Sequence, residues 1–288
     1  MHKDFSIHSP VKVRVNLNNL KHNYATLRKA CGTEVMPVLK ADAYGHGLLP
    51  CTRAMLEAGV KIIGVGIVPE ALFLRDQGIS CEILSMFGPL NAAEAAQAAT
   101  HDIISLAPAM EQLKMLSAHA SKDKPAKVAL KFDTGMARLG FTKNDVPALI
   151  AALRGMPAVK PVMAMSHFAV ADEISGVDFT REQIAMFKDI FTALKAEYPD
   201  LKGSLCNSSG GMAYADARLD LVRAGIALYG SNPFQGTEQE SLGHGLKPVM
   251  EISSSLVQVH ALRKGQSISY GRTFTAERDM VVGIVACG

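Results

Sequence analysis

From Thr33 onward, the sequence alternates short apolar runs with amphipathic segments of helical period, and this alternation restricts the fold more than any other feature. Apolar runs rich in Val, Ile and Leu that alternate with helical segments are typical of repeated βα units and a parallel sheet. Such runs occur at residues 34–40, 61–66, 81–87, 102–106, 127–132, 159–167, 203–207 and 219–223. Each run but the last is followed by a helical segment, so the pattern predicts an α/β fold, a TIM-like (β/α)8 barrel.

One helix shows capping chemistry at its expected start. Thr180 is followed three residues later by Gln183, which matches a capping box, where two side chains bond the free N–H groups of the first turn. Apolar residues then recur at helical spacing as far as Leu194, and Pro199 ends the pattern. The sequence therefore predicts a helix that begins at Thr180.

Two segments lie outside the predicted barrel. An early apolar run and a helical segment precede it, and residues 249–288 read as consecutive strands without helices, separated by turn residues. We expect the early strand to join this later β region. The expected division is residues 1–32 for the first strand and helix, 33–235 for the barrel, and 236–288 for a partial all-β domain.

The sequence ends inside the apolar run 280–288, with no polar tail or closing strand after it. A small β domain with an open apolar edge forms a core of its own with difficulty. We therefore expect a β domain that is incomplete in this sequence, either because the chain is cut short or because a partner supplies the rest.

Charge and composition exclude several classes of partner. Lys and Arg number 30 against 27 Asp and Glu, a net charge of +3, without a basic block or an acidic tail. This balance argues against nucleic acid or an anionic membrane as the main partner. No run approaches the ~18 apolar residues of a membrane span, and the first residues lack the apolar core of a signal peptide. The 5 cysteines are scattered and show no metal-ligand spacing, so we expect a reducing, cytoplasmic setting and a small-molecule partner.

Barrel enzymes carry their reactive residues at the carboxyl ends of strands and on the loops that follow. Lys40 closes the apolar run VMPVLK, where partial desolvation of its ammonium group makes it a candidate Schiff-base former. The alternative is a lysine that extends to solvent from a strand end, and the strand context alone favours that alternative. Polar residues also end or follow later strands, namely Lys131, Arg138, His167, Asn207, Ser208 and Arg223.

Small residues follow the last two predicted strands, as Asn-Ser-Ser-Gly-Gly at 207–211 and Arg-Ala-Gly at 223–225. Loops of this kind, with free backbone amides, form the usual phosphate site of such barrels. Together with Lys40, they indicate a phosphorylated aldehyde cofactor, pyridoxal 5'-phosphate (PLP).

Four motifs in order make the resemblance to one family specific. They are VLKADAYGHG at 38–47, KFDTGMARLGF at 131–141, RAGIALYG at 223–230 and SYGRTF at 269–274. In these motifs, and over essentially its whole length, the chain resembles the alanine racemases. The resemblance implies PLP-dependent racemisation of L-alanine to D-alanine for peptidoglycan, on a barrel with a carboxyl-terminal β domain, in a homodimer.

The resemblance also implies a role for each motif residue. Lys40 would carry PLP covalently and act as the base on one face of the substrate, and Tyr270 would act on the opposite face, in the active site of the other subunit. Racemisation needs a proton carrier on both faces. A phenol needs help to give up its proton near neutral pH, and His167 and Arg223 are the expected helpers.

The remaining implied roles concern binding. Arg223 would face the pyridine nitrogen, and Arg138 would lie beside the cofactor's phenolic oxygen and the substrate carboxylate. Lys131 matches a lysine that is often carbamylated in the family and orients that arginine. The other residues expected to bind the cofactor, chiefly at its phosphate, are Tyr44, Asn207, Ser208 and the backbone amides of Gly225 and Ile226.

The sequence departs from the family pattern in two places. Ser204 stands where some members have a histidine that bonds the pyridine-facing arginine, and the chain ends before a GYADG motif whose domain supplies further ligands. We therefore expect impaired activity from this chain. The alternatives are a serine or broad-specificity racemase of the same fold and a non-catalytic PLP-binding barrel, against which the SYGRTF motif argues.

Overall fold

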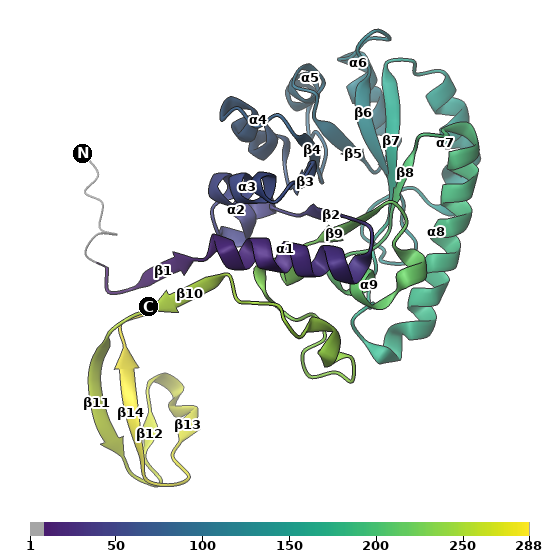
Figure 1. Cartoon of the computed structure of the whole chain (residues 1–288). Helices are drawn as coiled ribbons and strands as arrows, with labels where there is room; N and C mark the ends of the chain where they lie inside the picture. Colours follow the sequence, from purple (N-terminus) through teal and green to yellow (C-terminus); the bar gives the residue numbers. More distant parts are fainter. Residues whose placement is uncertain (1–8, 288) are drawn as a thin grey trace. The chain divides into compact units, whose positions relative to one another are not determined.

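The computed structural model describes residues 9–287 and divides the chain into two compact units. The larger unit is Asn16–Val249, and the smaller combines the described parts of Met1–Val15 and Met250–Gly288 (Figure 1). The larger unit thus ends at Val249 and not at the predicted boundary, residue 235. The reason is that the segment 236–249 forms hydrogen bonds with the first helix. The Asn23 side chain donates to the Lys247 carbonyl and accepts from the Lys247 N–H, both at 2.8 Å.

The larger unit contains all the strands predicted for the barrel. They are β2 (Glu34–Pro37), β3 (Ile62–Val65), β4 (Glu82–Ser85), β5 (Ile104–Ala107), β6 (Ala126–Lys131), β7 (Val159–Met165), β8 (Lys202–Ser204) and β9 (Leu221–Ala224). Strands β3 to β8 pair in parallel in chain order, and β2 pairs in parallel with β9. Hydrogen bonds join the two sheets, from Leu39 N–H to the Gly64 carbonyl (2.6 Å) and from Arg223 N–H to the Cys206 carbonyl (3.0 Å). The predicted barrel fold is confirmed.

Helices lie around the strands (Figure 1). Apolar side chains of the strands form a buried core cluster. The helices are α1 (Leu17–Cys31), α2 (Lys40–Gly45), α3 (Leu48–Glu57), α4 (Val68–Asp76), α5 (Ala92–Thr100), α6 (Met110–Ala118), α7 (Val146–Arg154), α8 (Val177–Glu197) and α9 (Ser208–Ala213). Met36, Ile62, Leu106 and Met165 are among the buried strand residues of the core. This packing fixes the carboxyl ends of the strands, where the predicted site residues lie.

Helix α8 begins at Val177, so the predicted start at Thr180 is wrong. Thr180 and Gln183 are both fully buried, and the N-cap position is Gly176. Instead of capping its own helix, the Gln183 amide bonds two loops at the end of the barrel. The Thr-x-x-Gln letters occur inside the helix, where the free N–H groups that a cap serves are absent.

The smaller unit consists of short antiparallel pairs. Its strands are β1 (Lys12–Val15), β10 (Met250–Ser253), β11 (Leu256–Leu262), β12 (Ser267–Ile268), β13 (Phe274–Thr275) and β14 (Met280–Val285), and one 3-10 turn covers Tyr270–Arg272. β1 pairs with β10, β11 with β14, and β12 with β13. The amino-terminal strand thus joins the carboxyl-terminal strands, and apolar side chains such as Val257 and Val281 are exposed on them.

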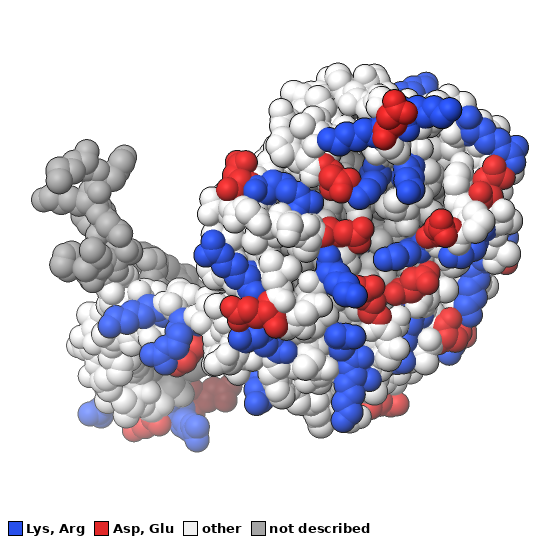
Figure 2. All heavy atoms as spheres, turned by 45° about the horizontal axis from the view of Figure 1, so that its top comes forward, with Lys and Arg blue, Asp and Glu red and all other residues white. Residues whose placement is uncertain are grey.

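Two surface properties bear on partners. On the face shown in Figure 2, Lys and Arg side chains are interspersed with Asp and Glu, and no large area carries a single sign. Between residues 9 and 287, none of the helices combines the length and the apolar character that crossing a membrane requires.

Candidate active site

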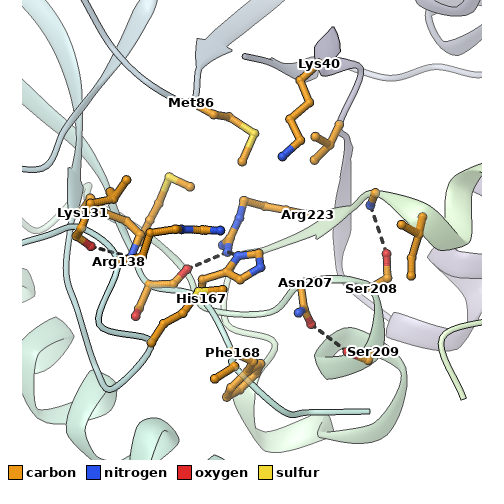
Figure 3. Close-up of a pocket in the computed structure, with 18 of the residues that line it drawn as sticks. Lys40, Met86, Lys131, Arg138, His167, Phe168, Asn207, Ser208, Ser209 and Arg223 are labelled. Atoms are coloured by element: carbon orange, nitrogen blue, oxygen red, sulfur yellow. Dashed lines mark hydrogen bonds between the residues drawn. The ribbon is translucent and has the colours of Figure 1, made fainter. Parts of the chain in front are cut away.

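A cavity of about 420 Å³ opens at the carboxyl ends of the barrel strands. It brings together every site residue that the sequence predicted on the barrel, namely Lys40, Tyr44, Lys131, Arg138, His167, Asn207, Ser208, Arg223, Gly225 and Ile226. In Figure 3 the Lys40 amine and the Arg138 and Arg223 guanidinium groups point toward the same part of the cavity as His167. Tyr270 belongs to the smaller unit, and its side chain is 97% exposed.

Lys40 is held by an unusual backbone turn. Ala41, Asp42, Ala43 and Tyr44 all have φ of 53–54°, so four consecutive residues of α2, none of them glycine, form a left-handed turn. This conformation costs roughly 1–2 kcal/mol for each such residue. The turn places the Lys40 amine 5.7 Å from the centre of the Tyr44 ring, and both side chains line the cavity. A β-carbon on Gly66 would lie 3.3 Å from that of Lys40, so glycine leaves room for the lysine stem.

The environment of Lys40 shifts the titration of its amine toward lower pH. Burial lowers the pKa of its amine, and the nearby Arg138 cation lowers it further, while the Glu70 carboxylate acts in the opposite direction. A neutral amine is the form that attacks an aldehyde. The lowered pKa increases the share of the Lys40 amine that can attack a carbonyl compound.

Arg223 lies on β9 beneath the cavity and is only 2% exposed. One guanidinium nitrogen donates to the Ser204 carbonyl (2.8 Å) and the Ser204 hydroxyl (2.7 Å). The other donates to the Ser166 carbonyl (2.6 Å) and to Nδ1 of His167 (3.0 Å). Ser204, where some family members have a histidine, thus supplies an oxygen to the same arginine. Within residues 9–287, the buried Nε of Arg223 has no hydrogen-bond acceptor.

His167 is a neutral imidazole in this site. Burial and the neighbouring cations, first Arg223 and then Arg138, lower the pKa of His167 to about 2. Because a guanidinium can only donate, Nδ1 of His167 accepts the bond from Arg223, and its proton resides on Nε2. The histidine therefore carries no charge at neutral pH.

Lys131, at the end of β6, is 7% exposed. Its amine donates to the backbone carbonyls of Phe132 (2.6 Å) and Leu139 (3.4 Å), and no ion pair among the described residues includes it. Burial and the Arg223 cation lower the pKa of Lys131 to about 7. A substantial fraction of this lysine is therefore neutral at physiological pH.

A buried polar network that sequence reasoning missed holds the loops of this site. Gln183 accepts from Ala169 N–H (3.1 Å) and donates to the His167 carbonyl (3.0 Å) and the Thr134 hydroxyl (3.2 Å). Thr134 in turn shares a hydrogen bond of 2.8 Å with the Ser166 hydroxyl. These contacts join the loop that carries Arg138 to the loop that carries His167. The one sequence signal that Gln183 holds these loops was the position of a polar residue on the apolar face of an amphipathic helix.

The loops after β8 and β9 meet at the other end of the cavity. The Asn207 side chain accepts from Gly210 N–H (3.0 Å), and the Ser208 hydroxyl accepts from Gly225 N–H (3.0 Å). A β-carbon on Gly225 would lie 3.2 Å from the Tyr44 hydroxyl oxygen, so glycine permits this close approach. Hydroxyl groups and backbone amides therefore converge where the sequence predicted a phosphate site (Figure 3).

Two family models match the chain. The model described as "Alanine racemase, N-terminal domain" covers residues 15–233, and that described as "Alanine racemase, C-terminal domain" covers residues 249–288. The chain is 46% identical over 281 residues to an alanine racemase of Nitratidesulfovibrio vulgaris strain Miyazaki F, covering 98% of this chain and 75% of that protein. It is 39% identical over 285 residues to one from Lawsonia intracellularis, covering 97% and 74%.

Solved structures agree with these matches. The biosynthetic alanine racemase from Pseudomonas aeruginosa is similar with a TM-score of 0.85 and 33% identity, over 97% of this chain and 76% of that one. The alanine racemase from Bartonella henselae, solved with covalently bound pyridoxal phosphate, is similar with a TM-score of 0.79 and 27% identity, over 96% and 74%. Both similarities extend over the barrel and the smaller unit together.

Proposed function

The chain belongs to the alanine racemase family, and from this premise we propose that it interconverts L- and D-alanine with PLP bound in the barrel cavity. It is an isomerase by this membership. The observation that carries the PLP proposal is the convergence of Lys40, Arg223 and the Ser208–Gly225 contact on one cavity.

Three parts of PLP find matching groups among the residues present. The Lys40 amine suits the aldehyde, and the hydroxyls of Tyr44 and Ser208, with Asn207 and the amides of Gly225 and Ile226, suit the phosphate. The unpartnered Nε–H of Arg223 suits an unprotonated pyridine nitrogen, because it offers a donor that needs an acceptor. When bound, PLP supplies an electron sink for the negative charge left by removal of the substrate's α-proton.

Arg223 limits how strongly that sink acts. Burial lowers its pKa, yet the guanidinium remains a cation at neutral pH. A cation facing the ring nitrogen disfavours protonation of the ring, which restricts side reactions that need a stronger sink. Ser204, Ser166 and His167 hold the guanidinium group, which would then face the ring nitrogen of a bound cofactor.

Racemisation requires a proton carrier on each face of the α-carbon. Lys40 serves one face, since its lowered pKa lets it exchange protons nearer neutral pH. For the other face we assign Tyr270 of the smaller unit, and we place it in the site of the partner subunit of a homodimer. The neutral His167, held by Arg223, is the proposed link through which Tyr270 is tuned.

Arg138 and Lys131 form the carboxylate side of the proposed site. The Arg138 cation is the proposed partner of the substrate carboxylate. A neutral Lys131 amine can add CO₂ and release a proton, which yields a carbamate anion that would offset the nearby cations and orient Arg138. Two further parts of the proposal are a cytoplasmic location, which the sequence led us to expect, and supply of D-alanine to peptidoglycan, which the family resemblance implies.

Covalent labelling tests the cofactor assignment. Borohydride treatment of the protein with PLP should fix a pyridoxyl group on the peptide that contains Lys40, and Lys40→Ala should abolish both this label and alanine racemisation. Lys143→Ala is the control, because Lys143 is paired with Asp189 away from the cavity. A label on another lysine in the unmodified protein contradicts the assignment.

A further inference from the structure

Glu70 joins the loop after β3 to the left-handed turn that carries Lys40. It occupies the third position of α4, where one carboxylate oxygen accepts from Gly66 N–H (2.7 Å) and Ile67 N–H (3.4 Å). Its other oxygen accepts from Asp42 N–H at 3.1 Å, across to the left-handed turn. One carboxylate therefore serves two segments that are far apart in the sequence.

The left-handed turn needs such support because its residues are strained. Asp42 lies in the middle of the turn, and the structure holds it at two points: its side chain accepts from Leu48 N–H (2.7 Å), and its own N–H donates to Glu70. Lys40 and Tyr44 lie at the two ends of the same turn. A relaxation of the turn toward ordinary backbone angles would therefore change the direction of both side chains at once.

We propose that Glu70 is a positioning residue for this site: its carboxylate holds the left-handed turn so that Lys40 and Tyr44 face the cavity together. The expected effect on PLP binding rests on the proposed function. The effect of Glu70 on the left-handed turn does not depend on it. A carboxylate is required because both oxygens accept. An amide has one oxygen and an NH₂ group that cannot accept, so Glu70→Gln must lose one of the two connections. The bond to Asp42 is the longer one, at 3.1 Å against 2.7 Å to Gly66, and we expect it to be the one that is lost.

The chain offers a matched control on the next helix. Glu94 occupies the third position of α5, and its carboxylate accepts from Leu90 N–H at 3.0 Å, within the start of its own helix. Glu94→Gln therefore repeats the loss of a helix-start carboxylate without touching the left-handed turn. Any effect confined to Glu70→Gln belongs to the connection with Asp42.

Amide hydrogen exchange of the full chain without PLP tests the geometry. In Glu70→Gln, the rate of amide exchange at residues 41–44 should rise about tenfold, because this factor corresponds to the net free energy of one hydrogen bond to a charged acceptor. In Glu94→Gln, the rate at these residues should remain unchanged. Unchanged exchange in the amides of β5 to β7 shows that the barrel remains folded. Equal exchange at 41–44 in both variants would overturn the proposal.

PLP titration and a rescue variant test the consequence. The Kd for PLP should rise about tenfold in Glu70→Gln and remain unchanged in Glu94→Gln. Adding Ala41→Gly to Glu70→Gln should recover most of this loss, because glycine adopts the left-handed conformation without penalty. Failure of this rescue, with the loss intact, would overturn the positioning role. If the unmodified chain does not bind PLP through Lys40, the proposed function fails, and the exchange comparison still decides the role of Glu70.

Discussion

At the residue scale, the cavity is dominated by positive charge with little to balance it. Lys40, Lys131, Arg138 and Arg223 all line it, His167 beside them is neutral, and Asp172 is the one carboxylate among the described lining residues. Burial makes uncompensated cations costly, which is why the pKa values of both lysines are lowered. A phosphate group and a substrate carboxylate would supply the missing negative charge, so this electrostatic field favours an anionic cofactor and an amino-acid substrate.

The lowered pKa of His167 predicts an acid sensitivity of the cofactor-free protein. The folded-state value is about 2, and an unfolded histidine titrates near ~6.5. Between these values the unfolded state binds more protons, so the free energy of unfolding falls as pH falls below ~6.5. From pH 7 to pH 5, the free energy of unfolding should fall by about 1–2 kcal/mol less in His167→Asn than in the unmodified protein.

Urea unfolding at the two pH values measures this change. The exposed His119, replaced by Asn, is the control and should leave the pH dependence as it is. The comparison uses the difference between the two pH values, so a constant effect of the substitution cancels. An unaltered pH dependence in His167→Asn would show that the histidine titrates normally in the folded protein.

At the element scale, one helix residue fixes two loops of the site. Gln183 on α8 bonds the loop after β7 directly and the loop after β6 through Thr134. Gln183→Met keeps the volume but leaves the Ala169 N–H and the His167 carbonyl without their partners. Because a buried unpaired group costs about 1–3 kcal/mol, the variant should lose about 2–4 kcal/mol of unfolding free energy.

Denaturant unfolding with Glu182→Met as control measures this loss. Glu182 is the exposed neighbour of Gln183 on the same helix, so its replacement should change stability by less than about 0.5 kcal/mol. A similar small change in Gln183→Met would mean that the two loops hold their positions without the amide.

The barrel could be predicted from the sequence because its strands are nearly continuous apolar runs. The positional rule for barrels placed Lys40, His167 and Arg223 at the carboxyl ends of the strands, and the family resemblance then singled them out as site residues. The left-handed turn could not be predicted, since Ala41–Tyr44 contains no glycine to signal positive φ. The start of α8 was mispredicted because the letters of a capping box also occur at buried positions.

The contacts of Glu70 and Gln183 were also beyond the sequence. Both residues act between loops that come from different βα units, and their partners are largely backbone groups, which carry no residue signature. The site residues that the family motifs contain could be named. The residues that hold those motifs in place required the three-dimensional arrangement.

At the scale of the whole molecule, the proposed reaction divides between two subunits. The cavity of one chain contains Lys40, and the proposed second proton carrier, Tyr270, is 97% exposed on the smaller unit. A head-to-tail homodimer would place the tyrosine of each chain in the cavity of its partner. This arrangement has a consequence for mixed dimers that a single-chain site does not share.

Mixing two inactive variants tests that consequence. Lys40→Ala and Tyr270→Phe should each be inactive alone, because each lacks one proton carrier. When the two chains pair at random, about half of the dimers are mixed, and in each of these one site combines an intact Lys40 with the partner's intact Tyr270. Racemisation by the mixture should therefore recover to about a quarter of that of the unmodified protein. Sites formed within one chain would leave the mixture inactive.

The complementary mixture reverses the outcome and excludes trivial explanations. When the double variant Lys40→Ala/Tyr270→Phe pairs at random with the unmodified chain, shared sites leave every mixed dimer with one carrier missing from each site. Only the unmodified homodimers are then active. Activity should be about a quarter of that of the same total amount of unmodified protein. Sites contained within one chain would retain about half. Because the two mixtures contain the same side chains at positions 40 and 270 in different combinations, differences in expression or PLP affinity cannot produce both results.

Activity of about half in the second mixture, with none in the first, would show that Tyr270 serves its own barrel.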